Sequence, residues 1–141
     1  MSHPTTLPGS RTRPVARAGT GERGAITIQI VILMPLMFLL MFAGMQGALT
    51  YHGRTVALAA AQEAARATAA QHGTTDHGRA AASALIERAG GTGTLNGVTI
   101  SVTRGPINAT ARVTGTTLSV IPGWSPRISQ TSTAPVERLT Q

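Results

Sequence analysis

One uncharged segment limits what this chain can fold into, because no Asp, Glu, Lys or Arg occurs from Ala25 to Tyr51. Its densest part, Ile26 to Ala48, is long enough for a helix to cross the hydrocarbon core of a bilayer, which takes about 20 apolar residues. The apolar core of a secretory signal peptide is usually shorter, about 7–15 residues. We therefore predict a transmembrane helix over residues 25–50.

Arginines flank this segment unevenly. The residues before it include Arg11, Arg13, Arg17 and Arg23, whereas only Arg54 follows closely. Positive residues favour the cytoplasmic side, so we expect the N-terminus in the cytoplasm and residues 51–141 outside, in the cell membrane of a single-pass protein. Residues 1–24 are rich in Pro, Thr, Gly and Arg and show no hydrophobic periodicity, which predicts a disordered cytoplasmic leader.

The net charge of +7 suggests nucleic acid at first sight, but the distribution of residues argues against it. The basic residues are all arginine and do not cluster on any predicted helix after the membrane segment. The aromatic residues are few, and two of them lie inside the apolar segment: Phe38, Phe42, Tyr51 and Trp124. No base-stacking platform is visible, so we expect no nucleic-acid partner. The absence of cysteine excludes disulfides and thiolate chemistry.

After the membrane segment, an alanine-rich stretch predicts that the helix continues from Tyr51 to about Gln71, because alanine is the best helix former. The sequence "HGTTDHG" breaks this helix. A second, shorter helix then runs to about Ala89, with Thr75 or Asp76 as its cap. Its predicted buried stripe contains Ala82, Leu85 and Ala89, and the glycines at 90 and 91 end it.

The last third of the chain changes to a period of two, which is typical of half-buried strands. Val98, Ile100 and Val102 alternate with polar residues in a first strand that starts near Gly97. Turns at 104–106 and 122–123 separate it from a second strand, 109–120, and a third, 128–136. Gly115 suggests a bulge in the second strand. We predict an α+β fold in which a small antiparallel sheet of about three strands packs on the alanine-rich helix.

No pattern in the sequence indicates catalysis. His72, Asp76 and His77 lie in a Gly-rich loop, and a metal site would need a further ligand. No serine falls in a nucleophile-elbow pattern, and no phosphate-binding glycine motif occurs. We therefore expect no catalytic residue, no metal site and no cofactor, and we do not expect an enzyme.

The spacing within the apolar segment is more informative than its apolarity. Gln29 follows Gly24 by five residues, Pro35 follows Gln29 by six, and Gln46 follows Pro35 by eleven. The stretch "LTYHGRTVALAAAQEAARATAA" comes next, and "ATARVTGTTLSVIPGWSPRISQTSTAPVERL" closes the chain. These features resemble the TadE-like family, the minor pilin-type subunits of tight-adherence (Flp) type IV pili. The resemblance implies a pilin-like α+β fold and a structural role in pilus assembly or secretion.

The resemblance also implies particular roles for residues. A prepilin peptidase would cut between Gly24 and Ala25, and the apolar helix would stay on the mature protein as its anchor and assembly element. Gln29, Pro35 and Gln46 would contact other pilus subunits and assembly-platform proteins, besides membrane lipid. Gly44 and Ala48 form a small-xxx-small pair that lets another helix approach closely.

Both positions where the family usually has glutamate are glutamine here, at Gln29 and Gln46. In type IV pilins the first glutamate is thought to pair with the N-terminal amine of a neighbouring subunit. Glutamine keeps the length and accepts a hydrogen bond, but it carries no charge and gains less from an ammonium group. This difference favours a minor or priming subunit, a minor pilin or pseudopilin, over a bulk pilin.

Two alternatives share the same N-terminal pattern. In the first, the chain is an uncleaved single-pass membrane protein whose outer domain binds a cell-envelope partner. In the second, signal peptidase cuts among the small residues at 43–48 and releases a secreted protein. Cleavage after Gly24 separates the pilin-type subunit from both.

Overall fold

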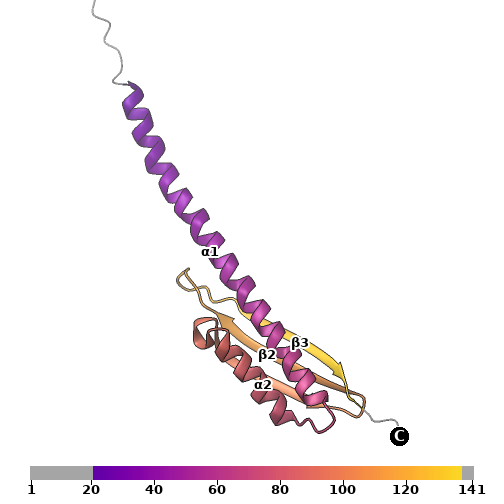
Figure 1. The fold of residues 1–141 in the computed structure, drawn as a ribbon. Coiled ribbons are helices and arrows are strands. Elements are labelled where there is room, and N and C mark those ends of the chain that lie inside the picture. Colours follow the sequence, from indigo (N-terminus) through magenta and orange to yellow (C-terminus); the bar gives the residue numbers. More distant parts are fainter. Residues whose placement is uncertain (1–20, 138–141) are drawn as a thin grey trace, which may run out of the picture. The chain divides into compact units, whose positions relative to one another are not determined.

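The computed structural model describes residues 21–137, with side chains described from Ile28 onward. The elements, labelled in Figure 1, are α1 (Gly21–Ala69), α2 (Thr75–Arg88), a short 3-10 turn η1 (Gly91–Gly93), β1 (Leu95–Arg104), β2 (Asn108–Thr117) and β3 (Arg127–Pro135). Most of the predicted leader lies outside the described residues. The chain divides into two compact units between Met37 and Phe38.

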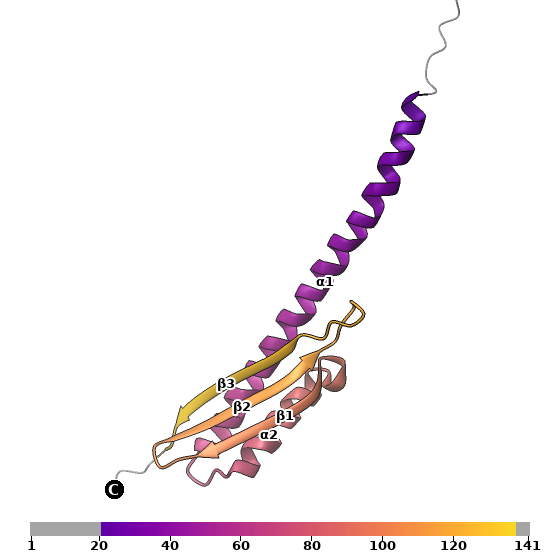
Figure 2. The ribbon, with the colours of Figure 1, turned by 180° about the vertical axis from the view of Figure 1, so that it is seen from behind.

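The strands form one antiparallel sheet in the order β1-β2-β3, so each strand pairs with its neighbour in sequence. Within the second unit, α2 and the C-terminal half of α1 lie on the same face of this sheet, as Figures 1 and 2 show from opposite sides. The predicted α+β class is confirmed, with a long apolar helix, a shorter helix and a three-stranded sheet.

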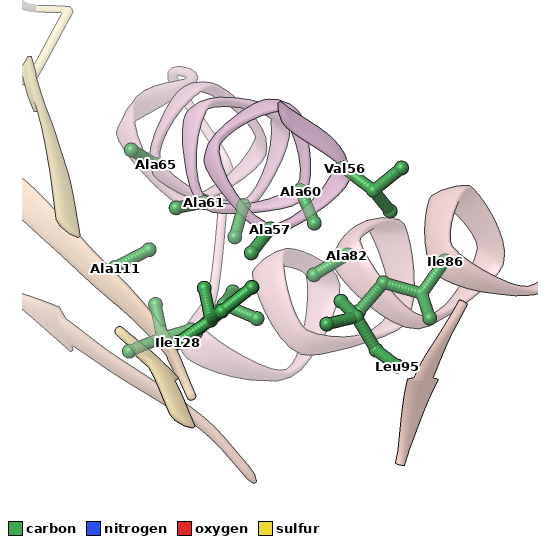
Figure 3. Close-up of a cluster of buried hydrophobic side chains, with 13 residues drawn as sticks. Val56, Ala57, Ala60, Ala61, Ala65, Ala82, Ile86, Leu95, Ala111 and Ile128 are labelled. Carbon is green, nitrogen blue, oxygen red and sulfur yellow. The ribbon is translucent and has the colours of Figure 1, made fainter. Parts of the chain in front are cut away.

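A single cluster of buried apolar side chains joins the two helices to the sheet (Figure 3). From α1 the cluster contains Val56 and otherwise only alanines: Ala57, Ala60, Ala61, Ala64 and Ala65. Larger side chains come from the opposite side: Ile86, Leu95, Val102, Val113 and Ile128. Because alanine adds little width, the backbone of α1 lies close to its neighbours. The predicted packing of the sheet on the alanine-rich helix is confirmed.

Two glycines mark the closest approaches of α1 to its neighbours. A Cβ atom at Gly53 would lie 2.3 Å from Cγ2 of Thr117 in β2. At Gly78 of α2, a Cβ atom would lie 2.1 Å from Oγ1 of Thr68 and 2.8 Å from the carbonyl oxygen of Ala64. A side chain at Gly78 would meet the main chain of α1, and a side chain at Gly53 would displace Thr117, which accounts for glycine at both positions.

The start of α2 lies slightly earlier than predicted. Thr74 is its N-cap, with extended backbone angles, and its side-chain oxygen accepts a hydrogen bond from the backbone N–H of His77 at 3.2 Å. The prediction of Thr75 or Asp76 as the cap was wrong. A threonine just before the first turn binds the orphan N–H three residues on, which is the usual N-cap geometry.

The buried stripe of α2 also differs from the predicted one. Gly78, Ala82 and Ile86 are the buried residues, whereas Leu85 and Ala89 are only partly buried against the core. The true stripe repeats every four residues and includes a glycine. Gly78 has no side chain to place it in an apolar stripe, and it is buried because α1 approaches so closely.

The sheet contains a bulge, and it lies in β1. Asn96 pairs with Thr116 and Thr99 with Thr114, so Gly97 and Val98 together oppose Gly115. Gly97 has φ of 59°, the left-handed conformation that the first residue of such a bulge requires. The glycine predicted to mark the bulge is therefore the residue opposite it.

The second strand is shorter than predicted. β2 ends at Thr117 instead of Val120, while β1 begins at Leu95, two residues before the predicted start, and β3 agrees within one residue at each end. The early end of β2 has a specific cause. The main-chain groups of Leu118 and Val120 bind a side chain of α1 and do not pair with a neighbouring strand.

Candidate functional site

From Ile28 to Met45, α1 exposes large apolar side chains around its whole circumference. They are Ile28, Ile30, Val31, Ile32, Leu33, Met34, Leu36, Met37, Phe38, Leu39, Leu40, Met41, Phe42 and Met45. Within the described part of the chain, α1 is the one helix long and apolar enough to cross a membrane, and none of its most apolar window is buried. A soluble core helix would be covered, so this surface is consistent with a single-pass membrane anchor.

Four of the predicted contact residues are exposed on α1: Gln29, Pro35, Gly44 and Ala48. The helix continues without a break through Pro35. No atom lies within 4 Å of the place where a Cβ atom of Gly44 would stand. The pair Gly44 and Ala48 is thus open to a neighbouring helix, and its use in assembly stays a prediction.

Gln46 differs from these four because its side chain is buried, with 1% of its surface exposed. Its Nε2 donates a hydrogen bond to the carbonyl oxygen of Leu118 at 3.2 Å. Its Oε1 accepts one from the backbone N–H of Val120 at 2.9 Å. Both ends of the amide are satisfied within the chain. Gln46 therefore fixes to α1 the β2–β3 loop, which we define as residues 118–126.

The β2–β3 loop borders two hollows along α1. The first, of about 530 Å³, is lined by Leu39, Phe42 and Ala43 of α1 and by Val120, Ile121 and Pro122 of the loop. The second, of about 500 Å³, is lined by Ala43, Gly47, Thr50, Tyr51, Arg54, Trp124 and Pro126. The first hollow has only apolar residues, whereas the second combines aromatic residues with a charge.

At its C-terminal end, α1 is held by Arg104 from the end of β1. The guanidinium donates hydrogen bonds to the main-chain carbonyl of Thr68, in the last turn of α1, and to those of Ala70 (3.0 Å) and Gly73 (2.7 Å), just beyond it. The last carbonyls of a helix lack intrahelical partners and carry partial negative charge. A cation there supplies hydrogen-bond donors and balances the partial negative charge, so Arg104 connects the sheet to the end of α1.

The open face of the sheet holds a shallow hollow of about 480 Å³ among hydroxyl and amide side chains. Two arginines lie in it, Arg112 and Arg127, and Nε of Arg112 donates a hydrogen bond to Oγ of Ser129 at 3.0 Å. No acidic residue occurs in the three strands. The hollow is therefore polar and positively charged.

Comparison with protein families identifies the part of the chain that carries the predicted spacing. The family model described as TadE-like protein matches residues 24–66. This chain carries a TadE-like segment. The family resemblance drawn from Gly24, Gln29, Pro35 and Gln46 is thereby confirmed, and it indicates a protein associated with the Tad pilus. No curated protein and no solved structure matched the chain.

The TadE-like segment covers most of α1 and stops before α2 and the sheet. It therefore contains the exposed apolar surface and most of the alanines that form the core, but not the β2–β3 loop or Arg104. Gln46 lies within the segment, while its two hydrogen-bond partners lie outside it. The residue usual in the family, a glutamate, lacks the N–H that Gln46 donates to Leu118.

The predicted processing site, Gly24 and Ala25, lies at the start of the TadE-like segment and in the first turns of α1, which begins at Gly21. Cleavage there stays a prediction. Among residues 28–137, no group of three His, Cys, Asp or Glu side chains is placed to hold a metal ion. His72 and His77 are both exposed.

Two residues of the site were not predicted in these roles. Arg104 was assigned to a turn, and Gln46 was expected to contact other subunits. Their partners lie 31–36 and 72–74 residues away in sequence. A single polar residue at the end of a strand or near the end of an apolar run is the only local signal for such contacts.

Proposed function

We propose that this chain is a minor pilin or pseudopilin, a membrane-anchored structural subunit of a Tad (Flp) type IV pilus or its secretion machinery. The observation that carries the proposal is the division of the TadE-like helix. Its first part exposes an uninterrupted apolar surface, and its second part is the core of a folded domain. A pilin-type subunit needs both, an anchor that passes from lipid to neighbouring subunits and a domain that folds independently of them.

Orientation follows from the arginines in this proposal. The leader, with four arginines, remains in the cytoplasm, and the domain from Tyr51 onward lies outside. A prepilin peptidase would then meet the bond between Gly24 and Ala25 at the cytoplasmic side. The further partners are membrane lipid, other pilus subunits and assembly-platform proteins. The chain would act by assembly and would carry out no chemical step, with no cofactor.

Gln29 is the residue that we assign to contacts between subunits. Between Ile28 and Met45 it is the only residue whose side chain forms conventional hydrogen bonds. Because the amide of Gln46 is used within the chain, Gln29 remains as the polar group available on this surface. Its carbonyl oxygen would accept a hydrogen bond from the N-terminal amine of a neighbour. Without a charge this contact is weaker than that of glutamate, which suits a subunit present in few copies.

The proposal is tested by the N-terminal residue and the intact mass of the protein isolated from host membranes. We expect a chain that begins at Ala25 and keeps its apolar helix. Gly24→Leu should block the cut, whereas Gly21→Leu, a matched change three residues earlier, should leave it unaffected. An intact leader in cells that process another prepilin would overturn the pilin-type mechanism.

A second candidate function is supported by the hollow on the open face of the sheet. If the leader is retained, the chain is a single-pass membrane protein whose outer domain binds an envelope component. Arg112 and Arg127, surrounded by hydroxyls and without nearby acids in the strands, suit an anionic polyol. Polyglycerol phosphate should then bind the full chain in detergent, and the double variant Arg112→Gln/Arg127→Gln should lose binding. Arg79→Gln on α2 is the control, and equal loss in that variant would refute a specific site.

A further inference from the structure

The β2–β3 loop has the composition of a membrane-facing segment. Residues 118–126 contain no charged side chain. Leu118 and Trp124 are exposed, with 39% and 54% of their surfaces accessible, and Ile121 is half-buried. Loops in water rarely present such a cluster of apolar side chains without a partner.

The loop lies against the apolar part of α1, near the C-terminal end of that part. Val120, Ile121 and Pro122 share a hollow with Leu39, Phe42 and Ala43. These α1 residues belong to the same exposed apolar surface that makes the helix long enough to span a membrane. The apolar surface of the loop is therefore continuous with that of the anchor, and whatever covers the helix at this level also covers the loop.

Several polar groups of the loop, six of them on the main chain, are paired within the chain. Gln46 binds the carbonyl of Leu118 and the N–H of Val120. Oγ of Ser119 donates to the carbonyl of Ile121 at 2.7 Å and accepts from its N–H at 3.2 Å. Two further main-chain pairs close the loop, Trp124 N–H to Ile121 O and Thr117 N–H to Pro126 O. Backbone that enters lipid must satisfy its own polar groups, because no water is there to do so.

The side chains around the loop change in polarity along α1. Trp124 shares its hollow with Tyr51 and Arg54, and Arg54 is the first charged residue after the apolar segment. Trp and Tyr favour the level of the lipid headgroups. Leu39 precedes Tyr51 by twelve residues, which is about 18 Å along a helix. The apolar tip of the loop therefore lies on the lipid side of the aromatic pair.

From this arrangement we propose that the β2–β3 loop enters the interface of the lipid bilayer beside α1. Val120–Pro122 contact acyl chains and Trp124 lies at the headgroups. The loop then acts as a second membrane contact that sets the depth of the domain, and Gln46 holds it in place. The proposal needs the membrane anchor but not a role in a pilus, so it stands or falls independently of leader cleavage.

Trp124 is the only tryptophan in the chain and serves as the probe. The full chain is placed in phosphatidylcholine–phosphatidylglycerol vesicles at a low protein-to-lipid ratio, with acyl chains brominated near or far from the headgroup. We expect Trp124 fluorescence to be quenched by the brominated lipids, more by the shallow label than by the deep one. Aqueous iodide should quench it weakly.

A matched probe makes this result specific. Ile107 is an exposed apolar residue too, but it lies in the β1–β2 turn, at the other end of β2. The ten residues of β2 span about 33 Å. In the double variant Trp124→Phe/Ile107→Trp, the new probe should be quenched by iodide and not by brominated lipid. The variant Ile121→Asp should reduce bromolipid quenching of Trp124 while leaving the domain folded by circular dichroism.

Two outcomes would overturn the proposal. The first is free quenching of Trp124 by iodide with no effect of brominated lipid, which would place the loop in water. The second is shielding from iodide that appears only as the protein-to-lipid ratio rises, again without bromolipid quenching. In that case a second copy of the chain covers the loop.

Discussion

The two halves of α1 differ in the size of their side chains and in how far these side chains are buried. From Ile28 to Met45 the helix has large side chains, and they are exposed. From Gly53 to Ala69 it is mostly alanine and glycine on its inner face, and these residues are fully covered. The more apolar half is thus outside the domain core and the less apolar half is inside it. Size and available partners, more than hydrophobicity, decide which half is buried in its own domain.

Gln46 lies at the border between these halves and connects the helix to the domain by hydrogen bonds, not by apolar packing. Beyond it, the alanine face meets α2 and the sheet, and at the far end Arg104 donates a hydrogen bond to the carbonyl of Thr68 in the last turn. The domain is therefore hydrogen-bonded to the second half of α1 at both of its ends. The first half contributes nothing to the buried cluster, which leaves its surface available to lipid or to other subunits.

The largest difference between the halves should appear when one alanine in each is enlarged. Ala64 has no exposed surface and its carbonyl oxygen lies beside Gly78, so Ala64→Leu forces the helices apart. We expect a loss of about 3 kcal/mol in the free energy of unfolding, at the upper end for overpacked cores. Ala48→Leu, on an exposed position, should change it by less than about 0.5 kcal/mol. Thermal unfolding of the two variants in the same detergent measures both changes. Equal losses of unfolding free energy would contradict the difference between the two halves of α1.

A smaller effect is expected when the amide at the border is removed. Gln46→Leu leaves the Leu118 carbonyl and the Val120 N–H without their partner, at a cost of about 2 kcal/mol. Hydrogen exchange of the Val120 amide should accelerate strongly. The matched change in the exposed half, Gln29→Leu, should not alter that amide. In Gln46→Glu, the Val120 amide should exchange faster than in Gln29→Leu and more slowly than in Gln46→Leu. The glutamate keeps the acceptor for the Val120 N–H but loses the donor to the Leu118 carbonyl.

The smallest effect is expected at the far end of the helix. Arg104→Met removes a partly exposed cation from three carbonyls, and solvent screening limits the loss to about 1 kcal/mol. Arg112→Met on the open face, where Nε of Arg112 donates a hydrogen bond to Ser129, should cost less. Urea denaturation of the two variants compares them. A larger loss for Arg112 would contradict the capping role of Arg104.

Much of the fold could be predicted because the patterns involved are local. The period of two over Val98, Ile100 and Val102 predicted β1, and the alanine run predicted the second half of α1. Turns at the predicted glycine and proline positions separate the strands. The spacing from Gly24 to Gln46 was sufficient to suggest the TadE-like family, which the family model then matched over 24–66.

The remaining features depend on contacts between distant residues. The end of β2 at Thr117 is set by Gln46, more than 70 residues earlier, and no periodicity within the strand reports it. The buried stripe of α2 includes Gly78 only because Thr68 and Ala64 lie against it. In the sequence, Arg104 is an arginine followed by a glycine, and this local pattern indicates no particular role. Its role depends on where the end of α1 lies in space relative to β1, which the sequence does not specify.

The most direct test of the account is whether the second half of α1 and the sheet fold without the first half. Thermal unfolding of residues 44–141 can be compared with that of the full chain in the same mild detergent. Because the buried cluster begins at Val56 and Gln46 is retained, we predict one cooperative transition within a few degrees of the full chain. Loss of the cooperative transition would show that the exposed apolar half is part of the fold, and would contradict its assignment as a separate surface for membrane and assembly.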